Sequence, residues 1–223
     1  MEFYHYHVFN RGVDKRNIFA NDQDRFRFIH DLFEFNNSKI LETTSRKFTS
    51  TNMSDIGCRT LEKQSRELLI NICAFCLMPN HYHLMLSPRV GGGVSKFMHK
   101  LNMGYTKYFN LKYERQGALF QGKYKHVLIE KENQFTYLPY YIHLNPLDLV
   151  APEWREGKLN DPSKAQQFLE KYRWSSLFDY CGKKNFPSIL NTGFLDKILA
   201  QQKIYNIKDW IRELDINDAI ILG

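Results

Sequence analysis

The stretch Met78-Pro79-Asn80-His81-Tyr82-His83-Leu84-Met85-Leu86 decides how the rest of the chain is arranged. It follows a mostly apolar run, Ile70 to Leu77, which predicts a buried strand. Pro79-Asn80 is typical of a turn, and the apolar end of the stretch predicts the body of a second strand. Because side chains two residues apart in a strand point to the same face, we expect His81 and His83 to project together.

Two imidazoles at this spacing can bind one divalent metal ion. The plainer interpretation is that both are polar residues at the end of a strand. An isolated His-x-His pattern favours that plainer interpretation. The choice therefore depends on what the chain supplies farther along.

Composition limits the classes of protein to consider. The chain has 223 residues, of which 43% are hydrophobic and 15% aromatic, so it can form a core and is not wholly disordered. It contains 31 Lys and Arg against 24 Asp and Glu, a net charge of +7, with an isoelectric point of about 9.1. This balance favours an anionic partner, with nucleic acid the first candidate.

The cysteines and the length of the apolar runs indicate whether the chain has a zinc site and in which cellular compartment we expect it. Cys73 and Cys76 lie in a strand pattern and are three residues apart, which predicts that they face opposite sides of the sheet. No second C-x-x-C motif completes a zinc site, so we interpret them as small apolar core residues. With no signal peptide and no apolar run long enough to span a membrane, we expect a soluble, cytoplasmic protein.

Before the histidine stretch, residues 3–9 alternate and predict a first strand. Asn21 or Asp22 can cap a helix that runs to about residue 41. Residues 42–67 are polar and rich in Ser and Thr, which predicts a flexible surface insertion.

After the stretch, Gly91–Gly93 predicts a hinge, and Ser95 can cap the next helix. That helix should bury a stripe of apolar residues spaced at i, i+3, i+4 and i+7. The stripe consists of Val94, Phe97, Met98, Leu101, Tyr105, Tyr108 and Phe109. Residues 123–130 predict a strand with a basic start. Basic charge there alternates with aromatic rings, as single-stranded nucleic-acid binding requires.

Glu132 to Leu144 predicts a further helix, in which Pro139 should introduce a kink or a break. The order β-α-β-β-α-β-α predicts an α+β fold: a ferredoxin-like antiparallel sheet with helices on one face, formed by residues 1–150. Beyond Val150 the sequence predicts a linker and then a small, mostly α C-terminal extension over residues 151–223.

The helix that ends near Asn145 carries three tyrosines. Tyr141 and Asn145 are four residues apart and share a helix face, whereas Tyr140 lies about 140° away from Asn145. If Asn145 offers its amide oxygen to a metal, Tyr141 is the hydroxyl held beside it. A phenol that attacks a phosphodiester would form a phosphotyrosine bond and release a 3′-hydroxyl. Tyr137 and Tyr140 are interpreted as packing residues.

Four motifs now give a family resemblance. They are His81-Tyr82-His83, Tyr141 to Pro146 (YIHLNP), Gly117 to Lys125 (GALFQGKYK) and Tyr6 to Gly12 (YHVFNRG). Together they resemble the HUH single-tyrosine transposases, and most closely the REP-associated tyrosine transposases, over about residues 1–150. Residues 172–176 (YRWSS) resemble part of the C-terminal tail of that branch.

The resemblance implies a metal-dependent endonuclease and strand transferase that cleaves single-stranded or hairpin DNA through a 5′-phosphotyrosine intermediate. It implies Tyr141 as the nucleophile and His81, His83 and Asn145 as the ligands of Mg²⁺ or Mn²⁺. The residues expected to contact DNA are Arg11, Arg115, Lys123 and Lys125.

Two other classes of protein are alternatives. A binding module derived from such a transposase would hold hairpin DNA or RNA without cutting it. A two-histidine phosphoesterase would repeat His-x-Ser/Thr, but here Met85 follows His83 and Asn145 follows His143 at that position. The DNA sequence recognised stays open, as does the choice between a monomer and a homodimer.

Overall fold

The computed structural model describes residues 4–38, 66–201 and 204–212. Almost all of the predicted insertion at 42–67 therefore lies outside the described residues. The first part of the described chain contains four strands and three α-helices. They are β1 (His5–Arg11), α1 (Asp22–Glu34), β2 (Ile70–Met78), β3 (His81–Pro88), α2 (Gly93–Lys112), β4 (Lys125–Ile129) and α3 (Glu132–Leu144).

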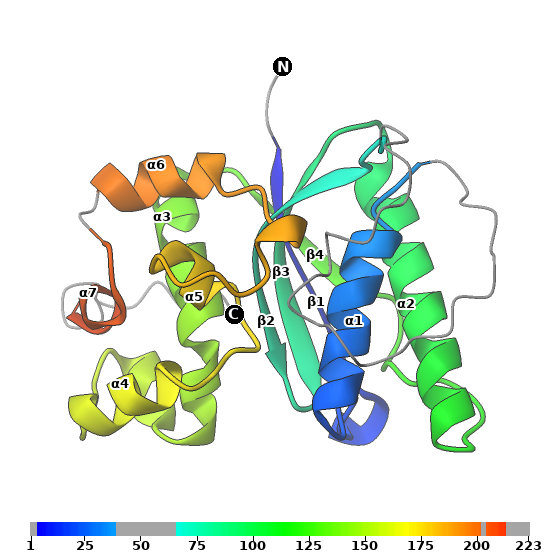
Figure 1. The fold of residues 1–223 in the computed structure, drawn as a ribbon, viewed down its shortest axis with the longest axis horizontal. Coiled ribbons are helices and arrows are strands. Elements are labelled where there is room, and N and C mark those ends of the chain that lie inside the picture. Colours follow the sequence, from blue (N-terminus) through cyan, green and yellow to red (C-terminus); the bar gives the residue numbers. More distant parts are fainter. Residues whose placement is uncertain (1–3, 39–65, 202–203, 213–223) are drawn as a thin grey trace.

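The strands form one sheet in the order β2-β3-β1-β4. Every neighbouring pair is antiparallel. This arrangement confirms the predicted α+β, ferredoxin-like sheet. In Figure 1 the sheet stands between two groups of helices, with α1 and α2 on one side.

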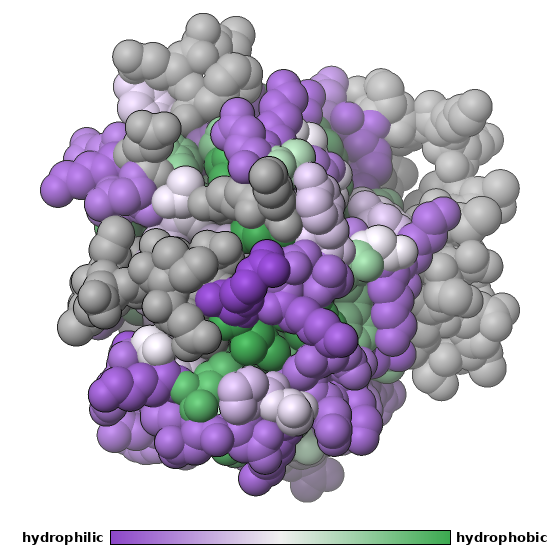
Figure 2. All heavy atoms as spheres, turned by 90° about the vertical axis from the view of Figure 1, so that its left-hand side faces the viewer, coloured by the Kyte–Doolittle hydropathy of each residue, from purple (hydrophilic) through white to green (hydrophobic). Residues whose placement is uncertain are grey.

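Helices cover both faces of the sheet. Val8, Tyr82 and Leu84 belong to a core shared with α1 and α2, the face on which helices were expected. Met85 belongs to a second core, shared with α3 and the C-terminal helices. Those helices are α4 (Pro162–Leu169), α5 (Leu177–Tyr180), α6 (Gly193–Gln201) and α7 (Ile207–Arg212). Figure 2 shows their outer side, which is mainly hydrophilic with small apolar areas.

The region predicted as a linker is folded. Pro152–Glu156 forms a 3₁₀ helix, and the Trp154 side chain is buried in the second core. Its composition resembles that of a linker, but the indole supplies enough apolar surface to bind the segment to the rest of the protein.

The Trp-Ser-Ser motif of the C-terminal part packs along the edge of the sheet. Ser176 N–H donates to the Phe75 carbonyl at 3.0 Å, and Phe75 N–H donates to Ser176 Oγ at 2.9 Å. Ser175 forms a β-bridge with Cys76. This contact satisfies backbone groups that would otherwise be exposed on the edge strand β2.

The expectation that Cys73 and Cys76 face opposite sides of the sheet is wrong. Pairing between β2 and β3 shifts between Ile72 and Ala74, so that one extra residue is inserted as a β-bulge. Both thiols consequently lie in the second core. Burial raises the pKa of Cys73 to about 12 and that of Cys76 well above its usual value, which fits unreactive core residues.

The helices differ from the sequence-based expectation at three places. α1 ends at Glu34 and not near residue 41. The N-cap of α2 is Gly92, with a positive φ of 69°, and not Ser95. A Cβ on Gly93 would lie 2.2 Å from the Leu69 carbonyl oxygen, so this glycine packs closely against the chain before β2. In α3, Pro139 is accommodated within one continuous helix. The apolar stripe predicted for α2 is confirmed as core.

A buried carboxylate joins α1 to α2. Asp24 is fully buried and accepts hydrogen bonds from Lys112 Nζ at 2.6 Å, Tyr113 Oη at 2.8 Å and Tyr108 Oη at 2.9 Å. Burial raises the pKa of Asp24, but these hydrogen bonds outweigh burial and leave the pKa below its usual value of 3.8.

We expect Asp24→Asn to lower the free energy of unfolding by about 3 kcal/mol at pH 7, because it leaves the Lys112 charge without its partner. The carboxylate stabilises the fold fully above pH 3.8, and this contribution disappears as the pH falls through the lower pKa of the folded state. Urea unfolding at several pH values should therefore show the two proteins converging in acid. Asp22→Asn, in an exposed pair with Arg25, is the matched control and should change stability by less than about 0.5 kcal/mol.

None of the described helices is long and apolar enough to cross a membrane.

Candidate functional site

His81 and His83 lie on β3 and face the side of the sheet covered by α3, because Tyr82 and Leu84 face the other side. Their ring centroids are 5.0 Å apart. Burial lowers the pKa of His81 to about 4 and that of His83 well below its usual value. Both imidazoles are therefore neutral at pH 7, the form that binds metals.

The hydrogen bonds of His81 leave one of its nitrogens free for a cation. Nδ1 lies 2.6 Å from Asn80 Oδ1, an oxygen that can only accept, so Nδ1 carries the ring proton. Nε2 then has a lone pair, and it lies 3.3 Å from Oδ1 of Asn145. Two acceptors face each other at this point, and a cation between them would satisfy both.

Asn145 is brought to His81 by the end of α3. It is fully buried, has helical backbone angles and follows Tyr141 by one helical turn. Its Nδ2 is buried without a hydrogen-bond partner. A buried polar atom without a partner is uncommon in native structures, so this amide keeps hydrogen-bonding capacity that the described residues do not satisfy.

His83 is held by a residue that sequence reasoning missed. His7 Nε2 lies 2.9 Å from His83 Nδ1, and both rings are buried. If His83 donates from Nδ1, its Nε2 is left with a lone pair for a metal. The sequence contained a signal, because His5-Tyr6-His7 has the same pattern as His81-Tyr82-His83. Only the pairing of β1 with β3 shows that the two motifs meet.

Tyr141 lies beside the histidines. Its ring centroid is 5.2 Å from that of His83 and 5.7 Å from that of His7. Tyr140 is buried against Trp210 and packs as expected. Tyr137 lies one turn earlier than Tyr141, with ring centroids 6.4 Å apart.

The segment after α3 adds a positive charge next to Tyr141. The guanidinium carbon of Arg155 lies 5.3 Å from the centre of the Tyr141 ring. Arg155 Nε donates to Asp148 Oδ1 at 2.8 Å, and Trp154 Nε1 donates to the same oxygen at 2.7 Å. The hydrogen bond with Asp148 raises the pKa of Arg155, so the group stays charged. Sequence reasoning missed Trp154 and Arg155 because their segment has the composition of a linker.

The four basic residues predicted to bind DNA do not lie together. Arg11 pairs with His81 in the sheet, and Lys125 pairs with Phe9, so both lie on the face of the candidate site and are exposed. Lys123 lines a cavity elsewhere on the protein. Arg115 follows α2 and donates to Asn110 at 3.0 Å.

The residues present fit a divalent cation, although the set has little negative charge. No group of three or more His, Cys, Asp or Glu side chains in the described parts of the chain is placed to hold a metal. The candidate set is instead two neutral imidazoles and the Asn145 amide oxygen. The two acceptors that face each other at 3.3 Å are the observation that fits the ion.

Comparison with known proteins identifies a family for the part of the chain that carries most of these side chains. Residues 40–145 match the family model described as "Transposase IS200 like". These residues belong to the IS200-like transposase family. The matched residues of this transposase domain include both histidines of β3, Tyr141 and Asn145. β1 with His7, and the segment with Arg155, lie outside the matched range.

One solved structure similar to the chain is described as a REP-associated tyrosine transposase bound to a REP hairpin. It is 10% identical in sequence, 85% of each chain is covered, and the TM-score is 0.47. We draw no conclusion on function from a likeness of this size. No curated protein sequence matches the chain.

Proposed function

We propose that this transposase is a metal-dependent endonuclease and strand transferase for single-stranded DNA, in which Tyr141 is the nucleophile. The observation that carries the proposal is the convergence of His81, His83, Asn145 and Tyr141 from two distant elements. The family of residues 40–145 supports it, because moving DNA requires breaking and rejoining phosphodiester bonds. Hairpin or repeated DNA is the substrate proposed, and the branch of REP-associated enzymes is the proposed place in the family.

The bonds broken and formed are as follows. Tyr141 Oη attacks the phosphorus, a Tyr141–phosphate bond forms, and the bond from phosphorus to the 3′-oxygen breaks. The phenolic proton leaves Tyr141 and the departing 3′-oxygen gains a proton, so a free 3′-hydroxyl results. Attack by a 3′-hydroxyl on the phosphotyrosine reverses the step and joins DNA without ATP.

His81, His83 and Asn145 would hold the metal ion, as Mg²⁺ or Mn²⁺. When bound, the ion polarises the phosphodiester and neutralises charge that develops on its oxygens. His7 orients His83, and Asn80 fixes the tautomer of His81. Arg11 and Lys125, which are exposed on the same face, would contact phosphates near the site.

The test of the proposal is covalent capture. Purified protein is incubated with Mn²⁺ and labelled single-stranded DNA copied from hairpins that flank its own gene, and the mixture is run on a denaturing gel. We expect a labelled band at protein mass, with the phosphorylated peptide containing Tyr141 identified by mass spectrometry. Tight hairpin binding without such a band would instead support a non-catalytic binding module.

Arg155 is proposed to stabilise the charge that develops around Tyr141 and the phosphate. We expect Arg155→Ala to slow adduct formation by about tenfold, because a single positive group near the reacting atoms is lost from a partly exposed position. Arg155→Lys keeps the charge but loses the two-pronged contact with Asp148, so it should recover part of the rate.

Single-turnover kinetics on the labelled DNA measure this effect. Arg173→Ala is the matched control, because Arg173 is also exposed and also lies over aromatic rings, those of Phe26 and Trp174. Equal rates for Arg155→Ala and the wild type would show that Arg155 serves only to bind Asp148.

A further inference from the structure

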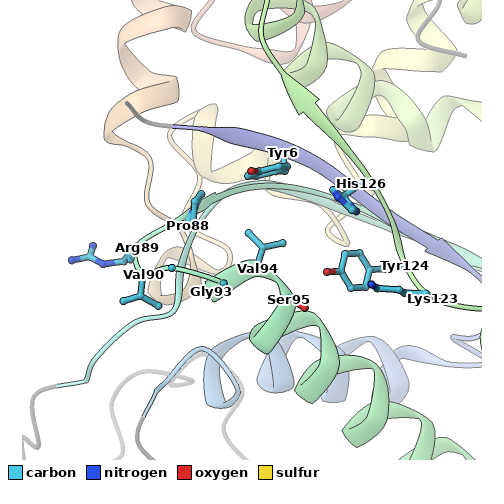
Figure 3. A pocket seen from close by; sticks show the side chains of 12 residues that line it. Tyr6, Pro88, Arg89, Val90, Gly93, Val94, Ser95, Lys123, Tyr124 and His126 are labelled. Carbon is cyan, nitrogen blue, oxygen red and sulfur yellow. The ribbon is translucent and has the colours of Figure 1, made fainter. Parts of the chain in front are cut away.

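A cavity of about 450 Å³ lies on the opposite face of the sheet from the candidate site. Tyr6 of β1, His126 of β4 and the first turn of α2 form its wall, as Figure 3 shows. His126 pairs with Val8, which belongs to the core under α1 and α2, so its side chain cannot reach Tyr141. The volume is within the range of small-ligand pockets, about 300–1,000 Å³.

The start of α2 leaves a positive helix end open to this cavity. The N-cap Gly92 provides no side-chain hydrogen bond, and no acidic residue lies in the first turn. The contrast with α1 is clear, because α1 begins with an Asn21 capping box and has two acidic residues in its first turn. A Cβ on Gly91 or Gly92 would meet nothing within 4 Å, so a ligand can approach the backbone there. Free N–H groups at a helix start bind anions.

The charge of the lining favours the same kind of ligand. Lys123 and His126 line the cavity and are exposed, and none of its lining residues is acidic. Arg89 also belongs to the lining, but its guanidinium donates to Asn71 Oδ1 at 3.1 Å and points away from the start of α2 in Figure 3. An anion at the α2 start would therefore meet the positive charge of Lys123, which precedes β4.

Aromatic rings form the other part of the wall. The His126 ring centroid lies 6.1 Å from that of Tyr6 and 5.7 Å from that of Tyr124. Tyr124 is only 9% exposed, and its ring lines the cavity, yet its hydroxyl has no hydrogen bond to any described residue. A hydroxyl without a partner among the described residues, at the wall of a cavity, is a group to which a ligand can hydrogen-bond.

We propose that this cavity binds one nucleotide of a single-stranded DNA segment. The phosphate lies at the start of α2, near Lys123, and the base packs against Tyr6 and Tyr124. Anionic charge and a planar ring are the two properties that this lining recognises together. The inference rests on the proposed DNA substrate, but it concerns a second contact, remote from Tyr141, that would hold the strand while the candidate site acts.

Ser95→Glu tests the phosphate contact without weakening the helix. Ser95 is exposed in the first turn of α2 and lines the cavity, so a carboxylate there favours the helix end but repels phosphate. We expect fluorescein-labelled oligodeoxythymidine to bind on the order of tenfold more weakly, measured by anisotropy, with no loss of melting temperature. Ser95→Gln is the matched control and should stay within about twofold of the wild type.

Lys123→Ala should weaken binding and reduce the salt dependence of log K by about one, as expected for one lost phosphate contact. Lys96→Ala removes an equal charge from the same part of α2 but outside the cavity lining, and should change binding less. Wild-type affinity in both Ser95→Glu and Lys123→Ala overturns the proposal.

Photo-cross-linking locates the base. DNA that contains 5-iododeoxyuridine should cross-link to Tyr6, Tyr124 or His126, as mapped by mass spectrometry. Covalent capture at Tyr141 is run on the same DNA. An adduct at Tyr141 with no cross-link in the cavity overturns the cavity proposal alone. A cross-link without an adduct supports binding in the cavity and contradicts the proposed cleavage. The absence of both the cross-link and the adduct contradicts both proposals.

Discussion

Tyr141→Phe is expected to abolish the covalent protein–DNA adduct, a loss of at least about a thousandfold in rate. The substitution removes only the hydroxyl. The ring that lies against His83, Trp154 and Arg155 stays, so the surroundings of the site are retained. The loss therefore measures the nucleophile itself, and DNA affinity should stay within about twofold.

Tyr137→Phe is the matched control, because Tyr137 is on the same helix with its ring centroid 6.4 Å from that of Tyr141. It should retain adduct formation. If an adduct persists in Tyr141→Phe and is lost in Tyr137→Phe, the nucleophile is Tyr137 and the assignment by helix face is wrong. Denaturing gels and peptide mapping distinguish these outcomes directly.

His81→Ala is expected to lower Mn²⁺ affinity by at least about a hundredfold, because it removes one of only three candidate ligands. Adduct formation should fall with it, since the phosphodiester would no longer be polarised. His81 is half-buried, so its truncation costs less stability than that of the fully enclosed His83. Mn²⁺ electron paramagnetic resonance measures the free ion and reports on binding without relying on activity.

His99→Ala is the control, because His99 is an exposed histidine on α2 and removes one imidazole from the surface. It should bind Mn²⁺ as the wild type does. A further variant, Asn145→Ala, tests the third ligand in the same way, with a smaller loss expected because a neutral amide oxygen binds the ion more weakly than an imidazole does. Unchanged Mn²⁺ affinity in His81→Ala would place the metal at another site.

Local periodicity accounts for the parts of the site that could be predicted. The alternation of a strand places His81 and His83 on one face, and the helical repeat places Asn145 one turn after Tyr141. Each of these relations involves residues a few positions apart, so backbone geometry alone determines it. The strand order followed as well, because the β-α-β-β-α-β pattern allows few topologies.

The same reasoning from strand alternation gives a wrong result at β2, because this strand contains a β-bulge. Cys73 and Cys76 share a face because a bulge inserts one residue between them. Nothing in the residue types at these positions predicts a bulge. The segment around Trp154 and Arg155 was misjudged for a related reason. Its polar, proline-containing composition is that of a linker, but its Trp154 indole is buried and both Trp154 and Arg155 donate to Asp148.

The sequence by itself therefore determined the fold class, the element order and the paired orientation of each set of site residues. Only the tertiary structure decided that these sets meet. His81 reaches Asn145, His7 reaches His83, and Arg155 reaches Tyr141 because strand pairing and the packing of α3 bring distant segments together. Such contacts depend on register and on side-chain packing across elements, and no local pattern in the chain specifies them.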